Sequence, residues 1–264
     1  MDVLSPRSLA DALRLRAEVP GAVPIEGGTD LMVDLNFDRR RPEAMLNLNE
    51  VPELRGWSHD NGSVRLGAGL TYTEATGAQL AGLLPALAEA SRTVGSPQIR
   101  NRGTIGGNLG TASPAGDALP PLLVERAEIE LASVRGTRRL PLTEFLVGPK
   151  RNALADDELI VAIHITPSGA AQTFMKVGPR NAMVIAVCSL ALAVDRERDE
   201  LRASFGSAGP VTGLVVARLA DVADFPERVV AAASPIDDVR GTAAYRRHAL
   251  RVLTKRALER CLAA

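Results

Sequence analysis

The stretch Thr104–Asp117 reads TIGGNLGTASPAGD and concentrates glycine and short hydroxyl side chains within fourteen residues. Gly106 and Gly107 have no Cβ and can adopt positive φ, so consecutive amides can form a concave site for an anion. The composition therefore favours a loop that holds a polyanion. A plain structural loop is an equally good interpretation on composition alone, because most glycine-rich loops bind no ligand.

The polar side chains of this stretch add to its binding capacity. Thr104, Thr111 and Ser113 supply hydroxyl groups, and Asp117 is its only charged residue. The Asp117 carboxylate could accept hydrogen bonds from ribose or polyol hydroxyls. Alternatively, Asp117 caps a helix that continues through Glu125.

A second glycine pair lies about 80 residues earlier, in Glu26–Asp30 (EGGTD). It follows a short apolar strand, Ala22–Ile25, and precedes a predicted helix over Leu31–Phe37. A strand, a glycine pair and a helix in this order are typical of phosphate loops, because a helix start presents free N–H groups to an anion. The basic run Arg39–Arg41 that follows is interpreted as a solvated helix end.

Two further arginines precede the first stretch. Arg100 and Arg102 are close enough in sequence to help neutralise a pyrophosphate, and alternation would place them on one face. Plain solvent exposure is an equally good interpretation.

The composition excludes several classes of partner. The 264 residues are 46% hydrophobic and 23% charged, as in an ordered globular protein. Lys plus Arg equals Asp plus Glu at 31 each, and aromatic residues make up only 3%. No basic face or set of stacking rings is therefore expected, which argues against a nucleic-acid partner.

The cysteines and the N-terminus limit the cofactors and the location. Cys188 and Cys261 lie in apolar runs and are predicted to be buried free thiols; two cysteines cannot hold an iron–sulfur cluster or a structural zinc site. The three histidines do not cluster, so neither a catalytic histidine nor a metal site is expected. Met1–Pro6 lacks the pattern of a signal peptide and no apolar run reaches about 18 residues, so we expect no membrane span and a cytoplasmic protein.

Both helices and strands are predicted along the rest of the chain. The N-terminal part begins with a helix capped at Ser5-Pro6, and Asp60-Asn61-Gly62 is a strong hairpin signal. Further on, an amphipathic helix is predicted over 83–94, and strands over 128–133, 138–140 and 159–165. After the small residues 167–170, an apolar run at 183–194 is expected to pair with a strand at 201–205, followed by helices over 212–219 and 245–262. The pattern indicates an α+β fold.

Several sequence landmarks occur in an order that resembles a known family. They are Glu26–Leu31 (EGGTDL), Pro52–Leu54 (PEL), Thr104–Asn108 (TIGGN), Ala112–Asp117 (ASPAGD), Asp157–Ile160 (DELI), Lys176–Met183 (KVGPRNAM) and Phe205–Pro210 (FGSAGP). Together they resemble the FAD-binding medium subunit of molybdenum hydroxylases, the family of xanthine dehydrogenase, aldehyde oxidase and carbon monoxide dehydrogenase. The resemblance spans nearly the whole chain.

The resemblance implies a two-subdomain FAD-binding domain of the vanillyl-alcohol-oxidase type, also called PCMH type, over residues 1–167. Its subdomains would cover about 1–55 and 56–167, and a C-terminal α+β domain of the carbon monoxide dehydrogenase flavoprotein type would cover 168–264. FAD would lie extended between the two subdomains.

The resemblance also implies which residues hold FAD. Backbone amides of two stretches would wrap the pyrophosphate, namely Gly27, Gly28, Thr29, Asp30 and Leu31, then Thr104, Ile105, Gly106, Gly107 and Asn108. Thr111 and Asp117 would hold sugar or ribityl hydroxyls, with Ser113 beside them. Ile160 would pack on one face of the flavin ring and Lys176 would lie near the ring. Val94 falls where the family often has an aromatic residue, so the ring should be more exposed on that side.

The function that the resemblance implies is electron transfer within a larger complex. Electrons would reach FAD from an iron–sulfur small subunit, which receives them from a molybdopterin large subunit, and would pass to NAD or another acceptor. The 2Fe-2S clusters and molybdopterin would belong to these partners. Two alternatives stay open: a self-sufficient FAD-dependent oxidoreductase, and a non-catalytic nucleotide-binding assembly protein.

Overall fold

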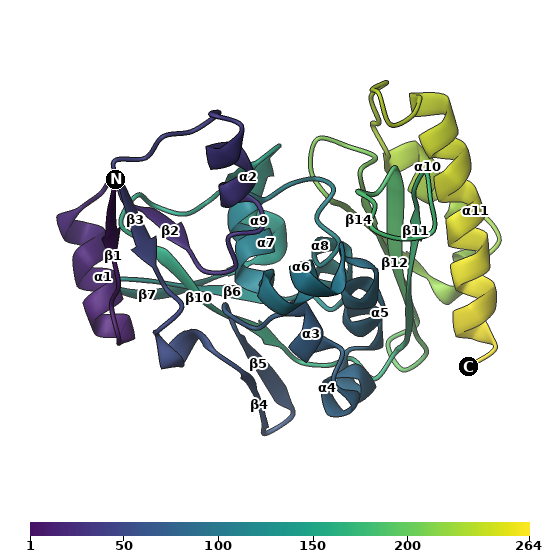
Figure 1. The fold of residues 1–264 in the computed structure, drawn as a ribbon. Helices are drawn as coiled ribbons and strands as arrows, with labels where there is room; N and C mark the ends of the chain where they lie inside the picture. The colour runs from purple at the N-terminus through teal and green to yellow at the C-terminus, as the bar shows by residue number, and fades with distance from the viewer.

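Three main β-sheets are arranged along the molecule in the computed structural model, which describes residues 1–264 (Figure 1). The N-terminus lies at one end of the molecule and the C-terminus at the other. The mixture of helices and strands agrees with the α+β prediction. No helix has the length and apolar character needed to cross a membrane.

The N-terminal sheet is parallel and has the order β1-β3-β2. Its elements are β1 (Asp2–Leu4), α1 (Leu9–Glu18), β2 (Val23–Ile25), α2 (Leu31–Asn36) and β3 (Ala44–Asn47), followed by a 3₁₀ turn (Pro52–Leu54). The predicted start of the first helix at Ser5-Pro6 is wrong, because Ser8 is the N-cap and its side chain accepts from the amide of Asp11. Ser5 and Pro6 lie outside any helix, and Asp2–Leu4 form β1, which pairs with β3.

The central sheet is antiparallel and has the order β4-β5-β10-β6-β7. Its strands are β4 (Trp57–Asp60), β5 (Ser63–Gly67), β6 (Glu128–Ser133), β7 (Gly136–Pro141) and β10 (Leu159–Ile165). A small hairpin, β8 (Leu146–Gly148) with β9 (Arg151–Asn152), stands apart. The predicted hairpin turn is confirmed: Asn61 and Gly62 have φ of 51° and 76°, as a tight turn between twisted strands requires.

Seven short helices accompany the central sheet. They are α3 (Tyr72–Ala75), α4 (Ala78–Leu83), α5 (Pro85–Thr93), α6 (Pro97–Arg102), α7 (Ile105–Thr111), α8 (Leu119–Val124) and α9 (Leu142–Phe145). The predicted 83–94 helix is confirmed as α5, although Leu84 separates it from α4. Ile105, Leu109 and Phe145 are fully buried in the cluster that joins these helices to the sheet.

The C-terminal sheet is antiparallel, in the order β11-β12-β13-β14. Its elements are β11 (Ala171–Val177), β12 (Cys188–Asp195), β13 (Glu200–Gly206), β14 (Gly213–Arg218), a 3₁₀ turn (Leu219–Asp221), α10 (Phe225–Ala232) and α11 (Ala243–Leu262). The predicted pairing of the apolar run with 201–205 is confirmed by β12 and β13. The predicted helix over 212–219 is wrong: this segment is β14, since its Leu-Val-Val core suits a strand that pairs with β13.

Both faces of the C-terminal sheet are covered. Leu190 and Leu192 point to the side that packs with α10 and α11, whereas Ala191 and Ala193 belong to a cluster with residues of α5 and α8. Figure 1 shows α11 along the outer face of this sheet and α5 and α8 on its inner side. The two cysteines are buried free thiols, as predicted.

Candidate functional site

The stretch that begins at Thr104 is a helix start, not a flexible loop. Thr104 is the N-cap of α7, and its Oγ1 accepts a hydrogen bond of 2.9 Å from the amide of Gly107. Neither Gly106 nor Gly107 has positive φ. The predicted concave turn of left-handed glycines is therefore wrong, because capping by Thr104 continues into regular helix.

The two glycines of α7 have different environments. The Gly106 amide donates to the Ala68 carbonyl over 2.7 Å, and a Cβ on Gly106 would lie 2.5 Å from that same oxygen. Gly106 therefore lets α7 pack against the backbone directly after β5. Gly107 is exposed instead. The amides of residues 105–108 all donate within the chain, so this stretch offers few free N–H groups.

The glycine loop at residues 27–31 has the free amides that the stretch at residues 104–108 lacks. The N–H groups of residues 27–31 donate to no acceptor in the chain, and Gly28 has a φ of 71°. Gly27 packs directly on the Arg102 carbonyl, where a Cβ would clash. Unsatisfied N–H groups in succession are the physical requirement for binding an anion.

Side-chain contacts join the two predicted FAD stretches. Thr111 Oγ1 donates to Asp30 Oδ2 over 3.0 Å. Arg102 Nη2 donates to the Glu26 carbonyl at 3.1 Å and to Asn49 Oδ1 at 3.0 Å. These bonds hold α7 and α6 beside the loop that enters α2, and Figure 1 shows α2 next to α7.

The prediction that Arg100 and Arg102 share one face by alternation is wrong, because both lie in α6. Only Arg102 reaches the glycine loop. Arg100 Nη1 donates to the carbonyls of Val94 and Gly95, at 3.0 and 3.1 Å.

The segment after α7 is a tight turn. Ser113 Oγ accepts from the amide of Ala115, and Asn108 Oδ1 accepts from the amide of Ala118. Ala118 is the N-cap of α8 without a side-chain hydrogen bond. The alternative in which Asp117 caps this helix is therefore wrong.

Asp117 forms a buried ion pair with Lys176, on β11 of the C-terminal sheet. The Nζ–Oδ2 distance is 2.6 Å, and the side chains are 8% and 6% exposed. Lys176 Nζ also donates to the carbonyl of Thr93 at 2.9 Å. Burial raises the pKa of Asp117 to about 6, although the attraction of Lys176 lowers it. Asp117 Oδ1 is buried and has no hydrogen-bond partner in the chain, so it can accept from a ligand hydroxyl.

The two predicted flavin-packing residues adjoin the same region. Val94 is the C-cap of α5 and follows Thr93, whose carbonyl binds Lys176. Ile160 lies at an irregularity in β10, where the pairing with β6 shifts register. A Cβ on Gly110 of α7 would lie 3.8 Å from Ile160 Cδ1, so Ile160 is beside α7.

Glu26 is a titratable residue of this region that the sequence reasoning did not single out. Burial raises its pKa to about 7, with smaller lowering effects from Arg55 and Arg102. Its Oε1 is buried without a partner, and Gly69 packs directly on it. The signal for Glu26 in the sequence was its position directly before the Gly27-Gly28 pair.

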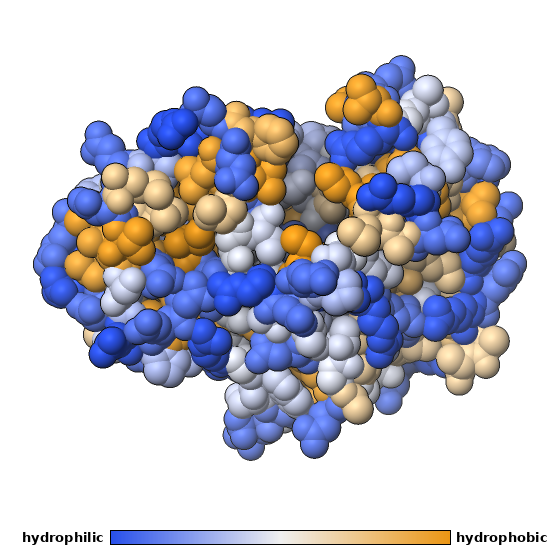
Figure 2. All heavy atoms as spheres, viewed as in Figure 1, coloured by the Kyte–Doolittle hydropathy of each residue, from blue (hydrophilic) through white to orange (hydrophobic).

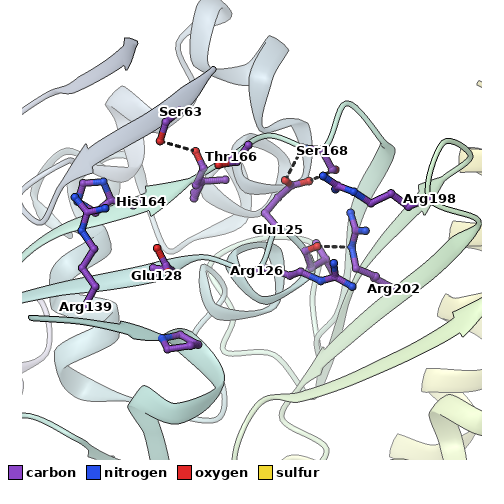
Figure 3. Close-up of a pocket in the computed structure, with 13 residues that line it drawn as sticks. Ser63, Glu125, Arg126, Glu128, Arg139, His164, Thr166, Ser168, Arg198 and Arg202 are labelled. Atoms are coloured by element: carbon purple, nitrogen blue, oxygen red, sulfur yellow. Dashed lines mark hydrogen bonds between the residues drawn. The ribbon is translucent and has the colours of Figure 1, made fainter. Parts of the chain in front are cut away.

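A separate polar cavity of about 520 Å³ lies where the chain passes from the central to the C-terminal sheet (Figure 3). Most of its charged groups have partners within the chain. Buried Arg202 donates to the Val124 carbonyl, Asp195 and Glu200, and Arg126 pairs with Glu200. Glu125 accepts from the amide and the hydroxyl of Ser168. This network links the end of α8 to the C-terminal sheet, and we assign it a structural role.

Comparison with known proteins identifies the class. Residues 1–168 match the family described as the FAD binding domain in molybdopterin dehydrogenase. The chain belongs to this family of FAD-binding subunits of molybdenum hydroxylases. It is therefore an oxidoreductase subunit, and FAD is the cofactor of its family.

Particular relatives cover most of the chain. The xanthine dehydrogenase FAD-binding subunit of Escherichia coli is 30% identical over 97% of this chain and 94% of that protein. The nicotinate dehydrogenase FAD-subunit of Eubacterium barkeri is 36% identical over 73% of this chain and 68% of that protein. Among solved structures, a chain of reconstituted CO dehydrogenase from Oligotropha carboxidovorans superposes with a TM-score of 0.93 at 26% identity, covering 100% of this chain and 98% of that chain.

Proposed function

We propose that this chain is the FAD-binding electron-transfer subunit of a molybdenum hydroxylase complex. The observation that carries the proposal is the run of five unsatisfied amides at residues 27–31, held against α7. A pyrophosphate is an anion that such a run can bind. We also propose the domain division predicted from the sequence, with a vanillyl-alcohol-oxidase type domain over 1–167 and a C-terminal domain over 168–264.

The local chemistry fits the rest of FAD. The unpartnered Asp117 Oδ1 is a buried acceptor that suits a sugar or ribityl hydroxyl. Gly107 is exposed and Asn108 is partly buried, so a ligand can reach the first turn of α7. Ile160 and Val94 offer aliphatic surface for a ring. Lys176 fixes the orientation of Asp117 and links this region to the C-terminal sheet.

In this proposal the two glycine stretches have different roles. The 27–31 loop supplies the free amides, whereas α7 positions Thr111, which bonds to Asp30, and Gly106, which seats the helix. When bound, FAD supplies the redox chemistry.

We propose that electrons come from an iron–sulfur small subunit, with molybdopterin on a large subunit, and leave to NAD or another acceptor. The names of the relatives support this assignment, since they are FAD subunits of dehydrogenases. The cytoplasmic location predicted from the sequence stays a prediction.

An absorption titration tests the proposal. The purified chain is reconstituted with FAD and desalted, and NADH is then added anaerobically while the flavin bands are recorded. We expect retained flavin absorbance that bleaches with NADH, or with a reduced iron–sulfur partner if the acceptor is not NAD. A chain that retains no FAD after reconstitution would refute the proposal.

The same preparation separates the two alternatives when an organic substrate is added in a further trial. A self-sufficient oxidoreductase would turn over an organic substrate without other subunits. A non-catalytic assembly protein would bind FAD or another nucleotide, but neither NADH nor a reduced partner would bleach the bound flavin.

A further inference from the structure

A second pocket is lined by Arg100, which binds carbonyls of the segment Thr93–Gly95, and the same segment contacts Lys176. Its volume is about 320 Å³, and it is formed by the helices α3, α5 and α6. Six residues line it: Thr73, Thr76, Arg92, Pro97, Arg100 and Asn101. None of them is acidic.

The positive charge of this pocket is not neutralised by any carboxylate. Arg92 has no hydrogen-bond or ion-pair partner in the chain, and the only acceptors of Arg100 are two backbone carbonyls. The three helices carry just two acidic residues, and both are engaged elsewhere. Glu74 accepts from Thr71, and Glu89 accepts from residues of β11 and from Arg260.

The remaining polar groups of the pocket offer both donors and acceptors. Asn101 Oδ1 accepts from the Thr73 hydroxyl over 2.6 Å, which leaves the two amide protons of Asn101 free to donate. Thr76 donates its hydroxyl proton to the Thr73 carbonyl, so its oxygen is left as an acceptor. Two guanidinium groups and an amide suit a phosphate, and hydroxyl oxygens suit the hydroxyls of a sugar.

The position of the pocket relates it to the FAD site. Thr93, Val94 and Gly95 present consecutive carbonyls: the first binds Lys176 and the next two bind Arg100. The last residue of α5 and the two residues after it therefore contact both Arg100, which lines the pocket, and Lys176, which we place beside the flavin. A nucleotide held here by a phosphate would lie close to that group.

We propose that the pocket formed by Arg92, Arg100 and Asn101 binds a phosphate of the nucleotide electron acceptor. The proposal rests on the proposed function, because it names where the acceptor is anchored. Arg92 is the main phosphate contact, since Arg100 is already fixed by the two carbonyls. The threonine oxygens add selectivity for a phosphate that is attached to a sugar.

Calorimetric titration of the FAD-saturated chain tests the pocket, with ADP, inorganic phosphate and adenosine as probes. Saturation with FAD keeps ADP out of the proposed FAD site. The variant is Arg92→Ala, which removes a side chain without partners. The matched control is Arg247→Ala, which removes an exposed and equally unpaired arginine from α11. Flavin absorbance is recorded for each protein.

We expect ADP to bind the wild type and Arg247→Ala alike and to bind Arg92→Ala about tenfold more weakly, as loss of a charged hydrogen bond predicts. Adenosine should not bind measurably. Equal ADP affinity in Arg92→Ala, or inorganic phosphate binding as tightly as ADP, would overturn the proposal. Loss of FAD from Arg92→Ala would also overturn it, by assigning the residue to the FAD site. Failure of the wild type to hold FAD would refute the proposed function instead.

Discussion

Thr111 and Asp30 lie 81 residues apart in the chain, and a hydrogen bond of 3.0 Å from the Thr111 hydroxyl to the Asp30 carboxylate joins them. This bond fixes the C-terminal end of α7 against the start of α2, where the free amides of residues 27–31 lie. The pyrophosphate loop that we propose is therefore held in place by a helix that itself offers few free amides.

Thr111→Val tests this connection. Valine has nearly the same shape but cannot donate to Asp30, so the loop should lose its anchor. We expect FAD to bind about fivefold more weakly, which corresponds to loss of about 1 kcal/mol. Fluorescence titration with FAD measures the effect. Thr137→Val, at an exposed position of β7, is the control; an equal loss of affinity in both variants would contradict the prediction.

Asp117→Ala should impair both stability and FAD binding. It leaves the Lys176 ammonium buried without its partner, which typically costs about 3–5 kcal/mol. In the double variant Asp117→Ala/Lys176→Met, an apolar side chain replaces the buried charge, so most of the stability should return. FAD affinity should stay low in both variants, because the acceptor oxygen is missing. Thermal unfolding and FAD titration measure the two effects, and recovery of FAD affinity together with stability would show that Asp117 acts only through the fold.

Glu26 should make the purified chain less stable as the pH rises from about 4.5 to 7. Its pKa is raised from 4.5 to about 7 in the fold, so over this range the unfolded chain has already lost a proton that the folded chain retains. Linkage then lowers the free energy of unfolding with rising pH, by about 3 kcal/mol at most. Glu26→Gln should flatten this part of the stability profile. Glu43→Gln, which changes an exposed carboxylate, should leave it unchanged, and urea unfolding at several pH values would decide.

Glycine substitutions in α7 should have opposite effects at two positions. Gly106→Ala places a methyl group 2.5 Å from the Ala68 carbonyl oxygen and should destabilise the fold strongly. Gly110→Ala places it 3.8 Å from the nearest heavy atom, Ile160 Cδ1, and should stabilise the helix by up to about 1 kcal/mol. Thermal unfolding of both variants is the measurement. A tolerated Gly106→Ala would contradict the close packing of α7 against Ala68.

Most elements with a strong local signal could be predicted from the sequence. The Asn61-Gly62 turn and the strands on both sides of it depend on neighbouring residues, so the local pattern was enough. The segment 212–219 shows the limit: its apolar residues suited a helix as well as a strand, and pairing with β13 decided the outcome. The prediction that Arg100 and Arg102 share one face was wrong for the same reason, because their directions depend on the helix that contains them.

In the candidate site, too, local sequence predicted some features and tertiary contacts decided the others. The glycine pairs, the hydroxyl residues and Asp117 could be singled out from composition and order, and the family resemblance named their ligand. The sequence could not show that the amides after Thr104 are used by Leu70, Ala68 and Thr104 itself, while those of residues 27–31 stay free. Hydrogen bonds between distant segments decide this, and no local pattern encodes them.

The sequence alone therefore determined the class of protein, the glycine-rich stretches and the lack of enough cysteines for a cluster. The tertiary structure decided which of the two stretches has free donors, that Asp117 pairs with Lys176 rather than capping a helix, and that Arg100 turns toward a second pocket. The physical reason is that a polar group becomes available to a ligand only when no other part of the folded chain has already satisfied it.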